Sequence, residues 1–339
     1  MNIHFAIVGC GHIAQRHARH ILTQKEAVLQ GGYDIKKERS EQFAANFGVK
    51  AYGSLPDVLA DEKVDIVVVC SPNGTHYDIS LQALEAGKHV LIEKPMTICK
   101  EHCEDLIRTS LDYNRALFVV KQNRFNPPVQ AVKSLLLSKK LGQIYSVTIN
   151  CFWNRNEAYY RQSDWKGTKK LDGGTLFTQY SHFIDIAYYL FGDFEVLQGV
   201  TKNANHQSLI DFEDTGHFIL RFKKSKAIGS FNYTTAAFRQ NMEGSITVFA
   251  ENGTVKIGGK YLNTIDYQAI KDIEISDLPS SNPANNYGFY EGSMSNHDKV
   301  INNVVQALNG REKIMTNAYD GLKVVELIEN MYEKAVFSS

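Results

Sequence analysis

A glycine-rich turn near the start of the chain constrains the fold more than any other feature. The apolar run Ile3–Val8 leads directly into Gly9-Cys10-Gly11-His12-Ile13-Ala14, and residues 12–23 have helical spacing. In such a strand–turn–helix unit the first glycine permits the tight turn, the second lets a pyrophosphate approach the backbone, and the small third residue lets helix and strand pack closely. The helix N-terminus then favours the phosphate charges. We therefore expect this turn to bind a dinucleotide through Gly9, Gly11, His12 and Ile13, with a purely structural turn as the alternative.

An acidic residue follows the next predicted strand, at about 27–33. Asp34 stands where a carboxylate bonds the adenosine ribose and repels a 2′-phosphate. Lys36 and Lys37 follow closely and would instead hold that phosphate. We predict NAD rather than NADP, and the alternative for Asp34 is a turn residue.

The first 120 residues alternate strand-like and helix-like segments. Asp65–Cys70 is apolar on both faces, as a central parallel strand should be. Further strands are predicted at 89–93 and 116–120, and helices at 38–46, 75–87 and 99–113. This rhythm is typical of a doubly wound parallel sheet with right-handed crossovers, a Rossmann-type arrangement.

The pattern changes after about residue 120. Helices are predicted at 126–139, 174–190, 294–309 and 317–336, and strands at 144–153, 214–223, 227–234, 245–250 and 253–257, with Glu251-Asn252-Gly253 as a hairpin turn. We therefore expect an α/β protein with two domains. Residues 1–121 form the dinucleotide domain, and 122–339 form an α+β domain with a mostly antiparallel open sheet, whose last helix is able to pack against the first domain.

Composition narrows the class of protein. The chain has 339 residues with 37 Lys plus Arg and 37 Asp plus Glu, so the charge balance argues against a nucleic-acid binder that needs a basic face, while leaving a local basic site open. No apolar run of 18 residues predicts a membrane span, and Met1 leads into a strand rather than a signal peptide. Five cysteines without a Cys-x-x-Cys motif favour a reducing, cytoplasmic location.

Two predicted strands end in polar clusters, where ligands of doubly wound folds bind. The first cluster is Cys70-Ser71-Pro72-Asn73-Gly74-Thr75-His76, and the second is Glu93-Lys94-Pro95. We expect Ser71, Asn73, His76 and Glu93 near the cofactor, with a structural role at the helix start as the alternative for His76. An ammonium at Lys94 would stabilise developing alkoxide charge, although a strand-end lysine is more often a solvated surface residue. A cis Pro95 would fix this loop.

These motifs, together with Asp172-Gly173-Gly174 and His182-Phe183-Ile184-Asp185, resemble those of the Gfo/Idh/MocA oxidoreductases over essentially the whole chain. The resemblance implies a Rossmann domain, a C-terminal α/β domain whose open sheet makes oligomer contacts in a homotetramer, and hydride transfer between NAD(P) and a sugar carbon. It implies Lys94 and His182 as catalytic residues and Gln122 as a cofactor contact. A histidine suits a base that removes a hydroxyl proton at neutral pH, and Tyr180 is the next candidate.

The chain departs from the commoner family pattern at one position. Many members carry Asp four residues before the histidine, where this chain has Thr178. With 122–128, 213–216 and 295–299, this segment resembles the branch that oxidises the 3-hydroxyl of UDP-N-acetyl-glucosaminuronic acid for surface polysaccharides. That resemblance implies the following substrate contacts: Lys94, Arg124, Thr178, Gln179, Ser181 and His182. It also raises 2-oxoglutarate as a reoxidant of NADH. The alternatives are another sugar or inositol dehydrogenase, or a catalytically silent NAD-binding regulator, which the presence of both Lys94 and His182 disfavours.

The segment 151–170 carries independent information on the substrate. It has five basic residues against two acidic ones, and it contains both tryptophans of the chain. Such a basic and aromatic stretch suits a ligand with several negative charges and a flat ring, such as a nucleotide sugar acid. Arg155, Arg161 and Trp165 are therefore predicted substrate contacts, with an oligomer contact loop as the alternative.

No metal site is predicted from spacing. His17-x-x-His20 and Cys99-x-x-x-Cys103 each offer two ligands on a helix, but neither has a third partner at a recognisable zinc spacing.

Overall fold

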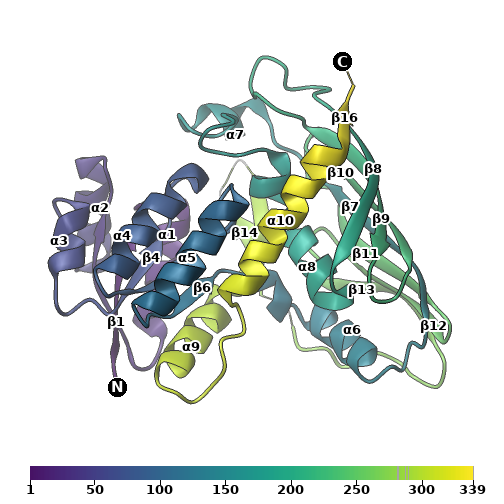
Figure 1. The fold of residues 1–339 in the computed structure, drawn as a ribbon, viewed down its shortest axis with the longest axis horizontal. Coiled ribbons are helices and arrows are strands. Elements are labelled where there is room, and N and C mark those ends of the chain that lie inside the picture. Colours follow the sequence, from purple (N-terminus) through teal and green to yellow (C-terminus); the bar gives the residue numbers. More distant parts are fainter. Residues whose placement is uncertain (281, 287, 289, 339) are drawn as a thin grey trace. The chain divides into compact units, whose positions relative to one another are not determined.

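The computed structural model describes residues 1–280, 282–286, 288 and 290–338. Contacts divide the chain into two units. The first unit comprises residues 1–121 and 297–326, and the second comprises 122–296 and the chain from Leu327 onward. Each unit has its own sheet (Figure 1).

The first unit is built on a six-stranded parallel sheet in the order β3-β2-β1-β4-β5-β6. Its strands are β1 (Ile3–Val8), β2 (Ala27–Tyr33), β3 (Lys50–Ala51), β4 (Ile66–Val69), β5 (His89–Ile92) and β6 (Leu117–Val119). Its helices are α1 (His12–Thr23), α2 (Lys37–Phe47), α3 (Leu55–Ala60), η1 (Asn73–Thr75), α4 (His76–Glu85), α5 (Lys100–Asp112), α9 (His297–Leu308) and the first part of α10 (Ala318–Lys334). The predicted doubly wound parallel sheet is confirmed.

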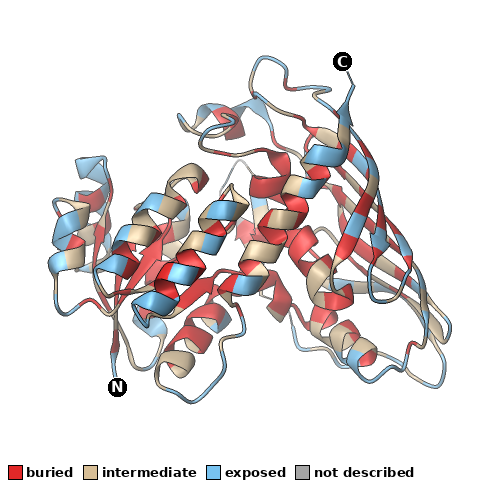
Figure 2. Cartoon of the chain, in the orientation of Figure 1, coloured by how far each residue is buried: buried red, intermediate tan, exposed pale blue. Residues whose placement is uncertain are grey.

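Burial explains why the central strands have so little polar character. All four residues of β4 are buried, because helices cover both faces of the sheet. Figure 2 shows these strands as buried, whereas the helices around them expose their outward faces. Because β1, β4 and β5 are neighbours and run parallel, their carboxyl ends lie side by side at one end of the sheet, which positions the predicted cofactor residues.

The second unit is built on an eight-stranded sheet in the order β13-β12-β11-β7-β10-β9-β8-β16. Its strands are β7 (Ile144–Phe152), β8 (Phe194–Lys202), β9 (Thr215–Phe222), β10 (Ile228–Thr234), β11 (Glu243–Ala250), β12 (Gly253–Gly258), β13 (Thr264–Ile270) and β16 (Ala335–Phe337), beside a small pair of β14 (Ala284–Asn286) and β15 (Glu291–Met294). Among the described strands of the large sheet, only β7–β10 and β8–β16 pair in parallel. The predicted, mostly antiparallel sheet is confirmed.

The two faces of this sheet differ in burial. Along β9, buried Phe218 and Leu220 alternate with exposed Ile219 and Arg221. The buried face packs against helix α8 (Ser181–Phe191), for example through the edge-to-face contact of Phe183 with Trp153. The remaining helices of this unit are η2 (Gln122–Phe125), α6 (Pro127–Leu137) and α7 (Glu157–Arg161).

Two predicted helices differ from the observed ones. The segment predicted as one helix over 174–190 begins as the π-helix η3 (Leu176–Tyr180) and becomes α-helical only at Ser181. The predicted helix 317–336 ends at Lys334, because its last residues join the sheet as β16 beside β8.

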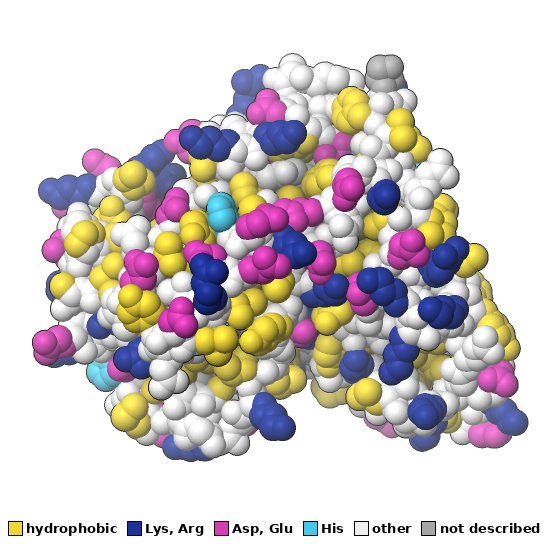
Figure 3. Space-filling view, viewed as in Figure 1, with side chains coloured by type: hydrophobic (Ala, Val, Ile, Leu, Met, Phe, Trp, Pro, Cys, Tyr) yellow, Lys and Arg dark blue, Asp and Glu magenta, His cyan; other side chains and the backbone are white. Residues whose placement is uncertain are grey.

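Within the described residues, no helix is long and apolar enough to cross a membrane. The five cysteines, all of them described, form no disulfide. Basic and acidic side chains are interspersed over the face in Figure 3, in keeping with the zero formal net charge.

Candidate active site

The phosphate turn has the geometry that its sequence predicts. Gly9 has φ +92°, and a Cβ there would lie 2.6 Å from the backbone nitrogen of Ser71. A Cβ on Gly11 would meet no atom within 4 Å, so its backbone borders open space. Ala14 is fully buried on the inner face of α1. The turn therefore requires glycine at its first position and leaves room for a ligand at its second.

Asp34 at the end of β2 is bound to the same turn. Its carboxylate accepts hydrogen bonds from the backbone N–H of Cys10 and of Lys36, both at 2.9 Å. Its own N–H donates to the Ser40 hydroxyl at 2.7 Å. Asp34 is therefore buried and fixed at the turn, and its bond to the N–H of Lys36 is of the kind that a turn residue makes.

His76 joins the loops that follow β4 and β5. Its Nδ1 lies 2.8 Å from the carbonyl oxygen of Pro95, and its Nε2 lies 3.0 Å from that of Ser71. Burial lowers the pKa of His76, so the neutral ring donates to one of these two carbonyls at a time. The predicted cis peptide at Lys94–Pro95 is present. The ring thus fixes the position of the loop that carries Lys94.

Neighbouring residues complete this strand-end cluster. Lys94 is half-buried directly after β5, and Asn73 is buried in η1. The Glu93 carboxylate accepts the backbone N–H of Lys94 at 3.1 Å and bonds to His17, so a cofactor contact from Glu93 would come from its main chain. His12 is the exposed first residue of α1, and Ile13, the second residue of this helix, is half-buried.

The second unit brings His182 and Gln122 to one serine. The Nε2 atom of His182 lies 3.3 Å from the Ser293 hydroxyl oxygen, and the Gln122 amide donates to the same oxygen at 2.9 Å. All three side chains are buried. Ser293 lies in the short strand β15, and no motif in the sequence distinguishes it.

The π-helix orients the residues just before His182. The Thr178 hydroxyl donates to the Asp172 carboxylate, and the Gln179 amide donates to the Tyr159 hydroxyl at 2.6 Å. The Ser181 hydroxyl is buried and has no hydrogen-bond partner among the described residues. Inserted π turns are frequent at functional sites, because they turn side chains away from ordinary helical spacing.

Tyr180 is a poor candidate for a base. Its hydroxyl donates to the backbone oxygen of Thr234 at 2.6 Å, and burial raises its pKa well above 10. The bond to Thr234 and the raised pKa therefore disfavour Tyr180 as the base if His182 is not the base.

The basic and aromatic segment is anchored by Arg155. This side chain is only 2% exposed, donates to the Gln179 amide oxygen at 2.7 Å and stacks over the rings of Trp153 and Tyr159. By contrast, Arg161 is exposed and pairs with Glu157 on the same short helix, and Trp165 is half-buried. The segment therefore combines one buried cation with others that reach solvent.

Arg124 forms a bidentate ion pair with Asp185. Its Nε and Nη2 atoms lie 2.9 and 2.6 Å from the two carboxylate oxygens, and both side chains are buried. The pair joins η2 to α8, three residues beyond His182. Arg124 therefore supports the helix that carries His182, in addition to its predicted role as a substrate contact.

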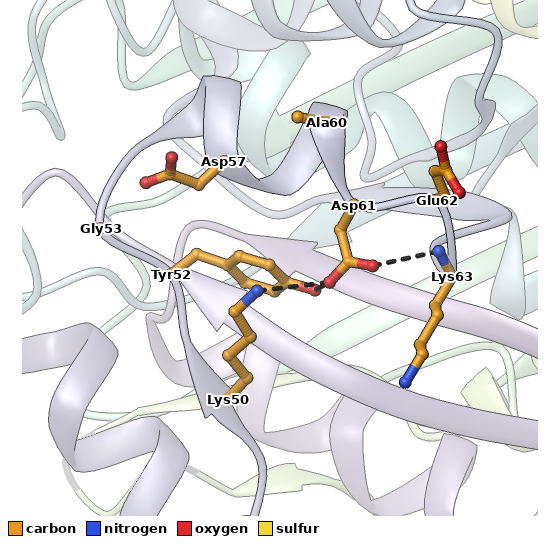
Figure 4. A pocket seen from close by; sticks show the side chains of 8 residues that line it. All are labelled: Lys50, Tyr52, Gly53, Asp57, Ala60, Asp61, Glu62 and Lys63. Carbon is orange, nitrogen blue, oxygen red and sulfur yellow. Dashed lines mark hydrogen bonds and ion pairs between the residues drawn. The ribbon is translucent and has the colours of Figure 1, made fainter.

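A separate pocket of about 560 Å³ lies beside the edge strand β3 of the first sheet (Figure 4). Its central carboxylate, Asp61, accepts the Tyr52 hydroxyl at 2.8 Å and lies 3.3 Å from the Lys50 ammonium. These bonds lower the pKa of Asp61, the Tyr52 hydroxyl first among them. The pocket borders the edge strand β3, and none of the predicted cofactor residues lines it, so it is not the predicted cofactor site.

Comparison with known proteins assigns the family. Residues 3–120 match the model of the Gfo/Idh/MocA oxidoreductases for the NAD-binding Rossmann fold, and residues 133–337 match that for the C-terminal alpha/beta domain. The chain belongs to the Gfo/Idh/MocA oxidoreductase family. The predicted family, fold class and cofactor NAD are thereby confirmed, and the chain is an NAD-dependent dehydrogenase of the sugar and polyol class.

Two solved structures and one curated relative illustrate the similarity. The WlbA dehydrogenase from Bordetella pertussis, in complex with NADH and UDP-GlcNAcA, has a TM-score of 0.88 and 32% identity over 98% of this chain and 96% of its own. The WlbA enzyme from Chromobacterium violaceum, with the same ligands, has a TM-score of 0.89 and 32% identity over 98% and 93%. Glucose-6-phosphate 3-dehydrogenase from Bacillus subtilis is 28% identical over 97% of this chain and 95% of its own length.

Proposed function

We propose that this protein oxidises the 3-hydroxyl of UDP-N-acetyl-glucosaminuronic acid to the ketone with NAD⁺, as a step in surface polysaccharide synthesis. The observation that carries the proposal is the 32% identity, over 98% of the chain, to two dehydrogenases crystallised with UDP-GlcNAcA. The names of two more distant relatives, glucose-6-phosphate 3-dehydrogenase and D-glucoside 3-dehydrogenase, also specify position 3 of a sugar.

The reaction assigns complementary roles to Lys94 and His182. NAD⁺, which the first unit would hold, would supply the acceptor for the hydride of the sugar carbon. The Lys94 ammonium donates a hydrogen bond to the reacting oxygen and stabilises its developing negative charge. His182 takes the hydroxyl proton on Nε2, the atom that faces Ser293. The products are the 3-keto sugar, NADH and a proton.

The cofactor residues follow from the first unit. Gly9, Gly11, His12 and Ile13 present the turn and the N-terminus of α1 to the pyrophosphate. Asp34 binds the adenosine ribose, and its carboxylate disfavours a 2′-phosphate. Around the nicotinamide we place Ser71, Asn73, His76, Glu93, Lys94 and Gln122.

A substrate acid with a pyrophosphate needs several cations and an aromatic surface. Arg155, Arg161 and Trp165 supply these, together with Arg124, Thr178, Gln179 and Ser181. The buried Ser181 hydroxyl supports this assignment, since a sugar hydroxyl or carboxylate would give it the partner that it lacks among the described residues. NADH is then reoxidised either after release or in place by 2-oxoglutarate, with Arg161 as the carboxylate partner.

The open face of the second sheet supports a homotetramer. Val200, Ile219, Ile228 and Phe249 are exposed there, and strand register places them on one face. Large apolar side chains exposed on one uncovered sheet face are typical of a protein interface.

The test is a turnover assay on UDP-sugars with the variants His182→Asn and Lys94→Met. Loss of the base should reduce the rate about 100- to 10,000-fold, and loss of the cation about 100- to 1,000-fold, while NAD binding persists. The two effects should not add fully, because both groups act on one oxygen. His102→Asn, on helix α5 and outside both the predicted site and the exposed sheet face, is the matched control.

Two outcomes would contradict parts of this proposal, and one further experiment addresses the fate of NADH. Retention of more than about a tenth of the single-turnover rate in His182→Asn would remove His182 as the base. Turnover of inositol or glucose 6-phosphate, but not of the UDP-sugar acid, would favour another dehydrogenase of the family. Identifying the nucleotide released on unfolding, and repeating the assay with and without 2-oxoglutarate, decides how NADH is reoxidised.

A further inference from the structure

Two histidines and a glutamate from distant parts of the chain meet inside the first unit. His17 lies on the buried face of α1, Glu93 follows β5, and His297 begins α9, which packs against α1. All three side chains are buried. One ligand-type atom of each lies within 4.8 Å of those of the other two.

The hydrogen bonds of this cluster are incomplete. The Nε2 atom of His17 is 2.7 Å from Oε1 of Glu93, whereas Nε2 of His297 is 3.6 Å from the same oxygen, too far for a hydrogen bond. Neither ring nitrogen of His297 has a hydrogen-bond partner among the described residues, nor does Nδ1 of His17. Because buried polar atoms are normally satisfied, the vacant nitrogens indicate that a further group belongs here.

The protonation states suit a cation. Burial lowers the pKa of His297 to about 4, so its ring is neutral near pH 7 and keeps a lone pair. Burial alone would raise the pKa of Glu93, but the hydrogen bond from His17 and the neighbouring His297 hold it well below 4.5. A neutral imidazole and an ionised carboxylate are the forms that ligate metals.

We propose that His17, Glu93 and His297 bind one divalent transition-metal ion inside the first unit. Two imidazole nitrogens and one carboxylate oxygen favour zinc over magnesium or calcium, which prefer oxygen ligands. Because protons compete with a metal ion for imidazole nitrogens, binding strengthens as pH rises. It links α1, the end of β5 and the start of α9, and thereby fixes the backbone directly before Lys94.

The sequence could not reveal this set from spacing. The helical pair that it offers is His17 with His20, but the His20 ring lies parallel to that of His297 at 6.4 Å and is not a member of the cluster. The second and third ligands come instead from Glu93 and His297, which only the fold brings to His17.

The experiment measures uptake of Zn²⁺ and Co²⁺ by chelator-treated protein, as ions retained per chain after dialysis and as cobalt absorption in the visible range. The wild type should retain one ion, with higher affinity at higher pH. His17→Ala and His297→Ala should each weaken binding at least about ten-fold. His20→Ala, on the same helix, is the matched control and should remain within about two-fold of the wild type.

Several results would contradict the proposed metal site. One is a wild type that retains no ion, and another is a His297→Ala variant that binds Zn²⁺ as tightly as the wild type. Loss in His20→Ala but not in His297→Ala would assign the metal to the helix surface. A thiolate charge-transfer band would assign it to a cysteine such as the half-buried Cys99. His297→Phe has a side chain of similar volume but no ligand atom. Its thermal melting temperature shows whether a loss of metal binding comes from the missing ligand or from misfolding. If neither His297 variant folds, the number of ions retained per wild-type chain still tests the site.

Discussion

Glu213 should make the stability of the protein depend on pH. This carboxyl group is 3% exposed, and its Oε1 atom accepts hydrogen bonds from the hydroxyls of Tyr233 at 3.0 Å and Tyr332 at 2.9 Å. Burial raises the pKa of Glu213 from 4.5 to about 7, in spite of these two bonds. The folded protein therefore holds a proton here over a pH range in which the unfolded chain has released it.

The sign and size of the effect follow from this difference. A folded pKa above the unfolded one gives a contribution that is complete below pH 4.5 and is lost as pH rises through about 7. Since each tenfold change in proton affinity corresponds to about 1.4 kcal/mol, the loss by pH 8 is on the order of 3 kcal/mol. Glu213→Gln resembles the protonated form, and should remove most of this loss.

The assay is urea unfolding of wild type and Glu213→Gln at several values between pH 5 and pH 8. The variant should gain relative to the wild type as pH rises, by up to about 3 kcal/mol, with the steepest change between pH 5 and pH 7. Glu62→Gln, at an exposed position, controls for the loss of one carboxylate. A constant difference between Glu213→Gln and wild type across this range would refute the reasoning.

Three further predictions concern the cofactor turn, cofactor choice and assembly. Gly9→Ala should abolish NAD binding, since its Cβ would meet the backbone of the loop after β4; isothermal titration checks this, and near-normal affinity would contradict it. Asp34→Ala should narrow the preference for NAD over NADP in fluorescence titrations, whereas a wild type that binds NADP ten-fold more tightly would show that Asp34 is misassigned. Ile219→Asp combined with Ile228→Asp should convert an oligomer into smaller species by light scattering, with Leu111→Asp, an exposed site on α5, as the control; a wild type that is only a 38 kDa monomer at micromolar concentration would exclude the interface.

The parallel sheet could be predicted because its signals are local. A buried strand such as β4 is a run of apolar residues, and the turn at Gly9 fixes the strand and helix beside it. The edge strand β3 consists of only two exposed residues, so its sequence shows no alternation of apolar and polar residues that would predict a strand. In the second unit, β8 alternates as a strand should but was not predicted, and β13 is largely exposed, which leaves it little hydrophobic pattern.

The site was predictable where a motif carries it and not where the fold assembles it. Lys94 and Asp34 stand directly after strands, so their positions follow from sequence. The hydrogen bonds that bring Gln122 and His182 to Ser293 span more than a hundred residues and leave no local pattern. Likewise, the π turn at 176–180 has the composition of an ordinary apolar helix, so periodicity alone assigns it to the α-helix that follows.

Thr178 shows how a departure from a family pattern is compensated in space. The resemblance noted from the sequence implies an aspartate at this position, and here the side chain is a neutral hydroxyl. That hydroxyl donates to the carboxylate of Asp172, which is buried and also accepts the backbone N–H of Gly167 at 2.7 Å. The negative charge is therefore carried by Asp172, the hydrogen-bond partner of Thr178, and not by residue 178 itself. A second carboxylate at 178 would face Asp172 across a buried contact, and like charges so placed cannot both ionise without cost. Threonine at 178 and aspartate at 172 are thus a coupled pair, and the local charge near His182 must be counted over both residues.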